Sequence, residues 1–574
     1  MSNPNLHEIS NDYIENMISN IKEMKAIVMD KETQIIFSLE FSKSLALKQE
    51  IFLFENIEKI QPSQKFNLSG IFFLRPTSQN LNYLKEILKN LNFKEIHLFF
   101  SNTVPDDYLQ KIAQYDINMQ VKSFQEVYFD YYVINSNVFH LNIESCISNL
   151  AMTPMEKWNE YDSQMFERII QGLISICLSN RIFPVIKCVR GSKITSILCK
   201  KISEYFNDNY NFIRKECGNN QNGLLFIFDR KEDPVTPLIN QWTYQAQIHE
   251  IIGIKNNVVQ LKGEKNNQNE KLVVSDIESI DKFFSLHMNS DYGNFTVEAN
   301  SAAEKLKKES NENSNKENTI EEIRKLIESL PEKRKESMNI TKHLKLTYEI
   351  IDYVNKYKLM DLSPLEQEIA VHDDKKGQYN QIVKFLSDDK IRQLDKAKLY
   401  LLYIFRYEGD SLINNLKEIM KENKMNDWII YGDLLLKYAG KNKRTLDCLE
   451  NKDFMAKGKK FFMNAFKGGS TNAFMQHISY LQNIVEGIIK NKNKENDYET
   501  YLSGNAPRPN KIIVFCFGGI TFEETKDLTN LSHQLNIPII CGGTDIINSK
   551  GFLTDLSMLK QKSDLNNDIM LNVN

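Results

Sequence analysis

The chain carries one half of a zinc-protease motif. His249-Glu250 matches the start of H-E-x-x-H, in which two histidines one helical turn apart bind zinc and the glutamate acts as general base. Position 253 is glycine, so the second ligand is missing and the pair cannot hold a catalytic metal in that way. A structural histidine is the simpler interpretation, and neither a metal nor a cofactor is predicted.

Other residues that could support chemistry also lack the required spacing. The sequence contains no G-x-x-x-x-G-K-[ST] loop, no G-x-G-x-x-G fingerprint and no G-x-S-x-G elbow. Glycine pairs at 518–519 and 542–543 follow apolar runs, but without a lysine or acid at a set distance they favour tight turns over a phosphate site. Eight cysteines never form C-x-x-C, which fits a reducing cytosol. We therefore predict no catalytic residue.

The composition narrows the class of protein. The chain has 574 residues, of which 41% are hydrophobic and 26% charged, so several domains with sizeable cores are expected. Lys+Arg 72 against Asp+Glu 75 gives a net charge of −3, which argues against a nucleic-acid partner held by bulk electrostatics. The N-terminus lacks an apolar leader, and the apolar run 512–520 is half the length of a membrane span. We expect a soluble, cytosolic protein.

The first 245 residues alternate short apolar runs with helical periodicity. This alternation is typical of α/β units with largely parallel sheets. The helices expected from the periodicity are 81–91 and 164–180. The runs expected as strands are 24–30, 33–41, 50–54, 68–76, 95–100, 139–143 and 223–229.

The remainder divides into a helical part and a return to α/β. Helical periodicity dominates between about 245 and 470 and includes a helix at 395–409. Residues 510–544 then indicate a strand, a helix and a second strand, which form a βαβ unit. Since two strands are not stable alone, we expect this unit to complete the sheet begun before residue 245. The predicted fold class is α/β with a large helical insertion.

Two amphipathic segments in the helical part flank a proline. Apolar stripes at spacings of three and four occupy 320–330 and 344–354, and Pro331 separates them. Proline removes a backbone donor and clashes with the preceding turn of a helix. We predict a helical hairpin, or one long helix broken there, with a bend at Leu330-Pro331.

The most distinctive segment is GLLFIFDRKEDPVTPLINQWTYQAQIHEIIGI, residues 223–254. It begins as an apolar strand that ends at Asp229-Arg230, followed by a turn at Asp233-Pro234. Thr236 is predicted to cap a helix whose first position is Pro237. The segment is therefore a strand–turn–helix junction at a domain boundary.

This segment resembles the signature of the SM family, the Sec-one/Munc-eighteen-like proteins that bind syntaxin-type SNAREs. Further blocks in family order are 24–44, 71–77, 363–370, 399–410 and 512–553. Residues of the WTYQAQIHE run are most similar to the endosomal and trans-Golgi (vacuolar protein sorting) branch. The signature positions are Asp229, Arg230, Asp233, Pro234, Thr236, Pro237, Trp242, Thr243, Tyr244, His249 and Glu250.

The resemblance implies a three-domain arch with a discontinuous second domain. The implied units are an α/β domain one (1–138), the first part of domain two (139–245), a mostly helical domain three (246–470) and the second part of domain two (471–574). Polar insertions at 262–271 and 307–318 depart from the family pattern.

The resemblance implies binding of a syntaxin-class (Qa) SNARE, or of an assembled SNARE bundle, in a cleft between domains one and three. The residues of domain one expected to face this cleft are Ser42, Lys43, Ser44 and Glu50. An ordinary solvated turn and helix start would explain the same four residues. Extension of the helix past Leu330-Pro331 would present a new face to SNAREs, and folding back would hide it.

A second contact implied by the resemblance is a pocket for the N-terminal peptide of the syntaxin. The matching stretch is 119–143, with Phe129 and Tyr132 as candidates. Strand alternation sends these two side chains to opposite faces, so at most one lines a pocket if the strand is regular. Core-facing strand residues are the alternative interpretation.

Three functions remain open from the sequence. The leading one is an SM protein of endosomal and trans-Golgi traffic that promotes SNARE assembly, with tethering factors as further partners. The second is an SM protein of Golgi–endoplasmic reticulum or exocytic traffic, and the third an α/β enzyme with an unrecognised site. We expect a cytoplasmic protein that reaches Golgi and endosomal membranes indirectly, through the SNARE, because no lipidation signal is present.

Overall fold

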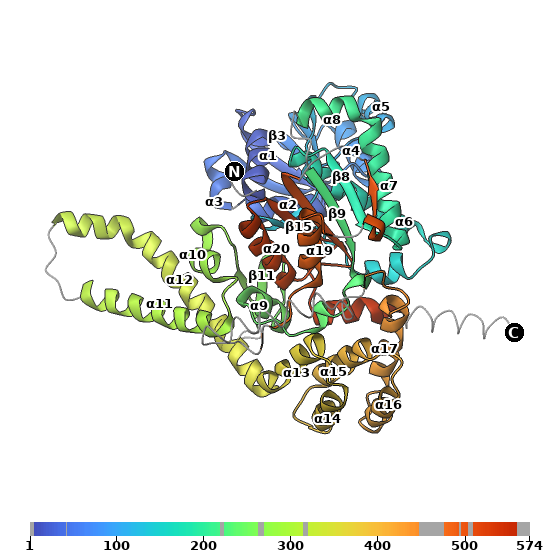
Figure 1. Ribbon diagram of the computed structural model, residues 1–574. Coiled ribbons are helices and arrows are strands. Elements are labelled where there is room, and N and C mark those ends of the chain that lie inside the picture. The colour runs from blue at the N-terminus through green and yellow to red at the C-terminus, as the bar shows by residue number, and fades with distance from the viewer. Residues whose placement is uncertain are drawn as a thin grey trace.

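The computed structural model describes residues 5–41, 43–217, 223–261, 269–313, 320–446, 474, 476–492, 495–502 and 509–559. Two sheets stand beside each other in the upper part of the molecule, a pair of long helices projects from one side, and a helical group lies below (Figure 1). The expected fold class, α/β with a large helical insertion, is confirmed.

The first sheet is fully parallel, with the strand order β2-β1-β3-β4-β5. Strands β1 and β3 are buried along their whole length, as the continuous apolar runs predict for a sheet covered on both faces. The strands are β1 (Lys25–Met29), β2 (Ile51–Asn56), β3 (Ser69–Leu74), β4 (Glu95–Phe100) and β5 (Val121–Glu126). The helices of this unit are α2 (Lys31–Glu40), α3 (Lys43–Lys48), α4 (Ser78–Asn90) and α5 (Asp106–Tyr115).

One strand prediction in this unit is wrong, because residues 33–41 belong to helix α2. Asp30 caps the helix: its carboxylate accepts the N–H groups of Glu32 and Thr33 at 3.0 and 2.9 Å. The Thr33 hydroxyl in turn accepts the N–H of Asp30 at 3.1 Å, which completes a capping box. The apolar, β-branched composition of the segment suggested a strand, but the local cap determines a helix.

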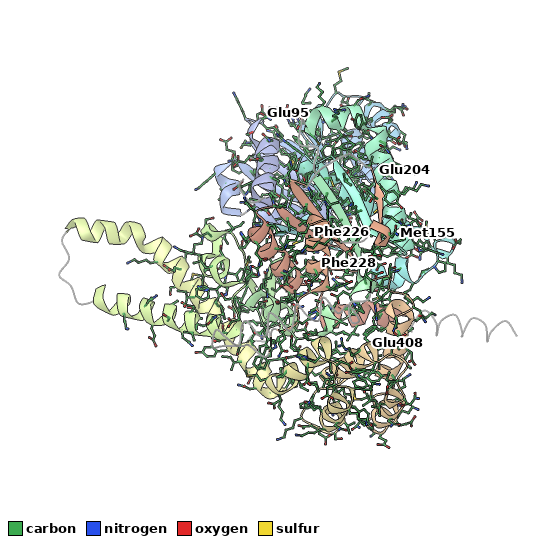
Figure 2. All side chains as sticks on the ribbon, in the orientation of Figure 1. Glu95, Met155, Glu204, Phe226, Phe228 and Glu408 are labelled. Atoms are coloured by element: carbon green, nitrogen blue, oxygen red, sulfur yellow. The ribbon has the colours of Figure 1, made fainter. Side chains whose placement is uncertain are left out.

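The second sheet combines segments from distant parts of the chain. Its order is β13-β8-β9-β14-β15-β7-β6, and β14 lies parallel between β9 and β15. The C-terminal βαβ unit therefore completes this sheet, as expected. Phe226 and Phe228 mark β9 in the middle of the body (Figure 2). The strands are β6 (Tyr132–Asn135), β7 (Val138–His140), β8 (Pro184–Val189), β9 (Gly223–Asp229), β13 (Tyr498–Tyr501), β14 (Lys511–Phe517) and β15 (Ile539–Gly543).

Strand β6 pairs in the second sheet, although its residues were assigned to domain one by the predicted limit at 138. The chain passes from one sheet to the other after Glu126, the end of β5. Helix α1 (Leu6–Ser19) packs against α2 and β6 and so bridges the two sheets. The helices of the second unit are α6 (Glu160–Ser179), α7 (Lys193–Asp208), α8 (Tyr210–Cys217), α19 (Tyr480–Ile489) and α20 (Phe522–Leu535).

The helical insertion begins with α9 (Tyr244–Ile251) and a small antiparallel sheet, β10-β11-β12. Its long helices α11 and α12 lie side by side and project from the body, whereas α13 to α17 form a separate group (Figure 1). The small strands are β10 (Ile254–Lys255), β11 (Val258–Leu261) and β12 (Glu270–Val273). The further helices are α10 (Glu278–His287), α11 (Tyr292–Asn313), α12 (Ile320–Lys356), α13 (Leu359–Val371), α14 (Lys375–Leu386), α15 (Gln393–Arg406), α16 (Leu412–Glu422) and α17 (Asn426–Ala439).

The predicted interruption at Leu330-Pro331 is not found. Helix α12 runs from Ile320 to Lys356 through both residues, and the chain reverses its direction between α11 and α12. A proline inside a helix removes one backbone hydrogen bond, and the turns on either side can continue. The hairpin in this structure is therefore the pair α11–α12, in an extended form. Among the described helices, none has the length and apolar character needed to cross a bilayer.

Candidate functional site

The signature segment forms a buried junction that begins with Arg230. This side chain is fully buried at the carboxyl end of β9, and its Nη2 and Nη1 atoms lie 2.6 and 2.8 Å from the carboxylate oxygens of Glu524 on α20. Arg230 also donates to the carbonyls of Gly519 and Asp233 at 2.9 and 3.1 Å. A buried charge is stable only when it is paired and hydrogen-bonded in this way.

Arg230 occupies the place where sheets of this type bind ligands. Open α/β sheets take up ligands at the carboxyl ends of neighbouring parallel strands, and here those ends belong to β9 and β14. Gly518 and Gly519, which follow β14, have φ angles of 94° and 93°, so the predicted tight turn is present. A Cβ atom on Gly518 would stand 2.6 Å from the Cβ of Arg230. The second pair, Gly542-Gly543, lies inside β15 and forms no turn.

Asp233 organises the turn after β9. One carboxylate oxygen accepts the N–H groups of Val235 and Thr236 at 3.2 and 3.0 Å, and the other accepts the Thr236 hydroxyl at 2.6 Å. Thr236 opens a single 3-10 turn, Thr236–Leu238, which Pro234 precedes and which contains Pro237. The prediction that Thr236 caps an α-helix is wrong, because its hydroxyl is engaged by Asp233 and α9 begins only at Tyr244.

The next three signature residues, Trp242, Thr243 and Tyr244, connect the second sheet unit to the helical insertion. The Trp242 indole N–H donates to Ser363 of α13 at 2.9 Å. The Tyr244 hydroxyl lies 2.8 Å from Nδ1 of His343 on α12, and its ring stacks on Phe295 of α11 with centroids 3.4 Å apart. The Thr243 hydroxyl instead donates to Glu523 of α20 at 3.0 Å. The run therefore connects the second sheet to both long helices.

The half-motif His249-Glu250 serves structure. His249 is buried, its Nδ1 accepts the N–H of Ile254 at 3.1 Å, and burial lowers the pKa of its imidazole, so the ring is neutral. Glu250 accepts the Ser549 N–H at 3.0 Å and lies 3.3 Å from Nζ of buried Lys398. Burial opposes ionisation of Glu250, but Lys398 and Ser549 hold its pKa below the usual value.

Lys398 is the centre of a second buried polar cluster. Its Nζ donates to the side-chain oxygen of Asn240 at 2.6 Å and lies 3.9 Å from Glu366. Glu366 accepts both the backbone and the side-chain N–H of Asn240 at 3.0 Å, and burial raises its pKa to about 7. In the part of the chain that the structure covers, no group of three His, Cys, Asp or Glu side chains could hold a metal ion.

A surface groove lies between the first sheet unit and the insertion. One wall is helix α2 and the other is the β10–β12 sheet with the start of α10, and the groove has a volume of about 650 Å³. Val273 and Ile280 on the second wall are 54% and 41% exposed. Such mixed surface can receive one face of an amphipathic helix. Its other apolar lining residues are Ile35, Leu39, Ile252 and Ile254, and the polar ones include Ser38, Gln260 and Lys271.

The predicted cleft residues of domain one follow α2 in the chain. Ser42 is outside the described residues, and Lys43 and Ser44 begin the short helix α3. Glu50 is exposed in a left-handed conformation, with φ 56°, and its carboxylate lies 4.0 Å from Nζ of Lys25.

Sequence reasoning missed the apolar side chains on this edge of the first sheet. Leu47, Phe52 and Phe54 on α3 and β2 are 72%, 59% and 37% exposed, and Phe54 packs against Phe37 of α2. The signal was present as two phenylalanines on a strand that ends the sheet. The exposed apolar surface of β2 thus adjoins α2, one wall of the groove.

The predicted peptide pocket at Phe129 and Tyr132 is not found, because both side chains are buried in the core. The Phe129 ring lies between Tyr13 and Phe73, with centroid distances of 6.1 and 6.0 Å. Residue 129 precedes β6 and belongs to the connection between the two sheets, so alternation does not send one of the two outward. The interpretation as core residues holds for both.

The opposite edge of the first sheet exposes apolar side chains instead. Strand β5 pairs only with β4 among the described strands. Ile117 and Met119, just before β5, are 83% and 77% exposed, and Leu109 on α5 is 36% exposed. This set, Leu109, Ile117 and Met119, is called the β5-edge patch below.

The fold and the junction define a class of protein. Two α/β sheets and a helical insertion that the signature segment connects to them match the architecture expected from the sequence. The Sec1 family model matches residues 25–555, so the chain belongs to the Sec1 family.

Comparison with individual proteins shows which members of this family the chain is similar to. The chain is 34% identical to vacuolar protein sorting-associated protein 45 of Dictyostelium discoideum over 556 residues, which cover 95% of each chain. It is 30% identical to the Homo sapiens protein of the same name, over 95% of this chain and 94% of that one. A solved structure of the SM protein Vps45 in complex with the Qa SNARE Tlg2 has a TM-score of 0.85 at 26% identity, covering 97% and 98%.

Proposed function

We propose that this protein is an SM-type regulator of vesicle docking and membrane fusion. It binds a syntaxin-class (Qa) SNARE and promotes SNARE complex assembly in endosomal and trans-Golgi traffic. It acts in the cytoplasm and associates peripherally with Golgi and endosomal membranes through the SNARE. Similarity over nearly the whole chain to proteins named for vacuolar protein sorting, one of them solved with a Qa SNARE, supports this function.

The observation that carries the proposal is the groove between α2 and the β10–β12 sheet. One wall belongs to the first sheet unit and the other to the helical insertion, the two parts between which the cleft of the arch is expected. Val273 and Ile280 offer apolar contacts beside polar side chains. SNARE motifs are amphipathic helices, and a helix in such a groove anchors through residues one and two turns apart. The exposed side chains of α3 and β2 extend the contact beyond the groove, toward the large area typical of signalling assemblies.

The protein acts by binding and not by catalysis. The crevice in which an α/β enzyme would hold a phosphate contains the chain's own Arg230–Glu524 ion pair. His249 and Glu250 are both used in structural hydrogen bonds. The residues that could do chemistry are therefore occupied in holding the frame together.

A second contact at the β5-edge patch binds the N-terminal peptide of the SNARE. The patch provides exposed apolar side chains next to a strand whose outer side is unpaired in the described sheet, and an extended peptide can dock on such an edge. A weak peptide site raises the local concentration of the SNARE at the groove, so two modest contacts act as one strong contact.

Titration calorimetry of the purified chain against cytosolic domains of Qa SNAREs tests the function. The endosomal or trans-Golgi SNARE should bind selectively. The double variant Val273→Glu/Ile280→Glu should weaken binding about tenfold, because two apolar contacts are lost and two charges would be buried.

The matched control is Met155→Glu, at a 45% exposed side chain on the flank opposite the hairpin (Figure 2). This control should bind like the wild type. Absence of binding to every Qa SNARE would overturn the function. Selective binding to a SNARE of another transport step would assign the protein to that step instead. An equal loss of SNARE affinity in the control variant would show that the groove does not bind the SNARE.

A further inference from the structure

A cavity separate from the groove lies where the two sheet units meet. It is open to solvent, has a volume of about 800 Å³ and is lined by α1, the end of β5, the end of α6, helix α8 and the start of β14. The side chains that give it its character are Asp12, Tyr13, Glu126, Arg181, Phe212 and Lys511. Neither the groove nor the β5-edge patch contributes a lining residue to this cavity.

Two cations face the cavity, and neither forms an ion pair with a carboxylate of the described residues. Lys511 donates to the side-chain oxygen of Asn180 at 2.8 Å, with the Asn180 carbonyl at 3.5 Å, and makes no ion pair within the described chain. Burial alone lowers the pKa of its amine to about 8. Arg181 follows Asn180 with a φ of 53°, and its exposed guanidinium has no hydrogen bond or ion pair to any described residue. A half-buried amine whose partners are neutral oxygens is a favourable place for an anion.

The two acids that line the cavity do not neutralise these cations. The carboxyl group of Glu126 has another partner, because its Oε1 accepts the N–H of Val104 at 2.7 Å. Burial also raises the pKa of this carboxyl group. Asp12 lies on the exposed side of α1 at the rim. Both cations therefore remain available to an anionic group that enters from solvent.

Helix α8 gives the cavity a rim of aromatic and basic residues. Phe212 is 56% exposed and Tyr210 39% exposed, and the charged side chains of Arg214 and Lys215 are also exposed. Arg214 lies over the Tyr210 ring at 5.4 Å, and that ring packs edge-on against Phe183. Aromatic rings with basic neighbours are the side chains that proteins place at the surface of anionic membranes.

We propose that this cavity and the exposed face of α8 form a binding site for the phosphomonoester headgroup of an anionic membrane lipid. Lys511 and Arg181 bind the phosphate, Phe212 and Tyr210 enter the interfacial layer, and Arg214 and Lys215 meet neighbouring lipid phosphates. The protein then contacts the membrane directly, in addition to its contact through the SNARE. Combined, the two contacts hold it on membranes that carry both partners.

Vesicle flotation with the purified full-length chain, in the absence of any SNARE, tests this proposal. The probes are phosphatidylcholine vesicles with and without a minor fraction of phosphatidylinositol monophosphate. The chain should float only with the phosphorylated lipid, and less so at high salt. Lys511→Gln and Arg181→Gln should each weaken binding about fivefold, the effect expected for one basic residue near an anionic surface. Lys511→Arg should retain binding, and Phe212→Ser should weaken it.

The matched control is Lys193→Gln, at an exposed lysine at the start of α7. It should bind like the wild type, and all variants should keep the wild-type melting temperature. Equal binding to neutral vesicles would overturn the proposal, and so would Lys511→Gln binding at wild-type affinity. Binding of soluble inositol trisphosphate without vesicle binding would show a site for a free anion and would also overturn it.

Discussion

Arg230 and Glu524 lie 294 positions apart in the chain and form an ion pair in which both side chains are fully buried. Arg230 directly follows strand β9, and Glu524 stands in the first turn of α20, where it also caps the helix with Thr521. The pair therefore joins the N-terminal and C-terminal contributions to the second sheet. The helical insertion lies between these two residues in the chain.

Removal of one partner of this pair should be costly. Arg230→Met leaves the Glu524 carboxylate buried without its cation, so we expect the free energy of unfolding to fall by about 3–5 kcal/mol. The double variant Arg230→Met/Glu524→Leu removes both charges and should lose less than the single variant. Urea denaturation followed by circular dichroism measures both. A single variant as stable as the wild type would contradict the role of the pair.

The hairpin α11–α12 should respond to Pro331. Because α12 already continues through this residue, Pro331→Ala adds a backbone donor and removes a steric clash, which favours the extended helix by up to ~3 kcal/mol. If SNAREs assemble on the extended form, the variant should accelerate SNARE complex formation in a fluorescence assembly assay. Ser337→Ala, at an exposed residue of the same helix, is the control. An unchanged assembly rate in Pro331→Ala would show that the hairpin does not set the rate of assembly.

The β5-edge patch should affect only the part of SNARE affinity that depends on the N-terminal peptide. Ile117→Asp/Met119→Asp places charges where the patch offers apolar contacts, so affinity for the SNARE with its peptide should fall about tenfold. Affinity for a SNARE without the peptide should stay unchanged. Tyr161→Asp, at a 63% exposed residue of α6, is the control. Equal losses with and without the peptide would place the peptide elsewhere.

Local sequence signals predicted the elements well where they were strong. The run 223–229 is β9 with the expected bounds, and the strand, helix and strand expected within 510–544 are β14, α20 and β15. Helix α2 was missed because its β-branched residues suggested a strand. The helix is determined instead by its cap, a reciprocal hydrogen-bond pattern between Asp30 and Thr33. The signature was recognised as a junction, and its partners Ser363, His343 and Glu524 follow only from the packed structure.

The candidate site was harder to predict because it depends on contacts across the chain. Ile35 of α2 and Val273 of β12 line the same groove, and no local pattern connects residues so far apart in the chain. Phe129 and Tyr132 were expected near a peptide pocket because the family resemblance matches that pocket to residues 119–143, with burial in the core as the alternative. The passage of the chain between two sheets buries both, and alternation along a single strand does not describe such a connection.

Glu232 gives the junction a dependence on pH. Its fully buried carboxylate accepts the N–H groups of Thr445 and Leu446, both at 2.9 Å, and so fastens β9 to the segment that follows α17. Burial raises the pKa of Glu232 from 4.5 to about 7. The folded chain therefore holds the proton of the Glu232 carboxyl group more tightly than the unfolded chain does. The stabilising effect of protonated Glu232 is complete below pH 4.5 and is lost as the pH rises through about 7.

The variant Glu232→Gln keeps an oxygen acceptor in the same place but cannot titrate. Between pH 5.5 and pH 8, the wild type should therefore lose about 2 kcal/mol of unfolding free energy relative to this variant. Urea denaturation of both proteins at the two pH values measures the difference, and all other titrating groups cancel in the comparison. A difference that stays constant with pH would mean that Glu232 is ionised throughout, whereas a difference that grows in the opposite sense would reverse the assigned direction of its pKa shift.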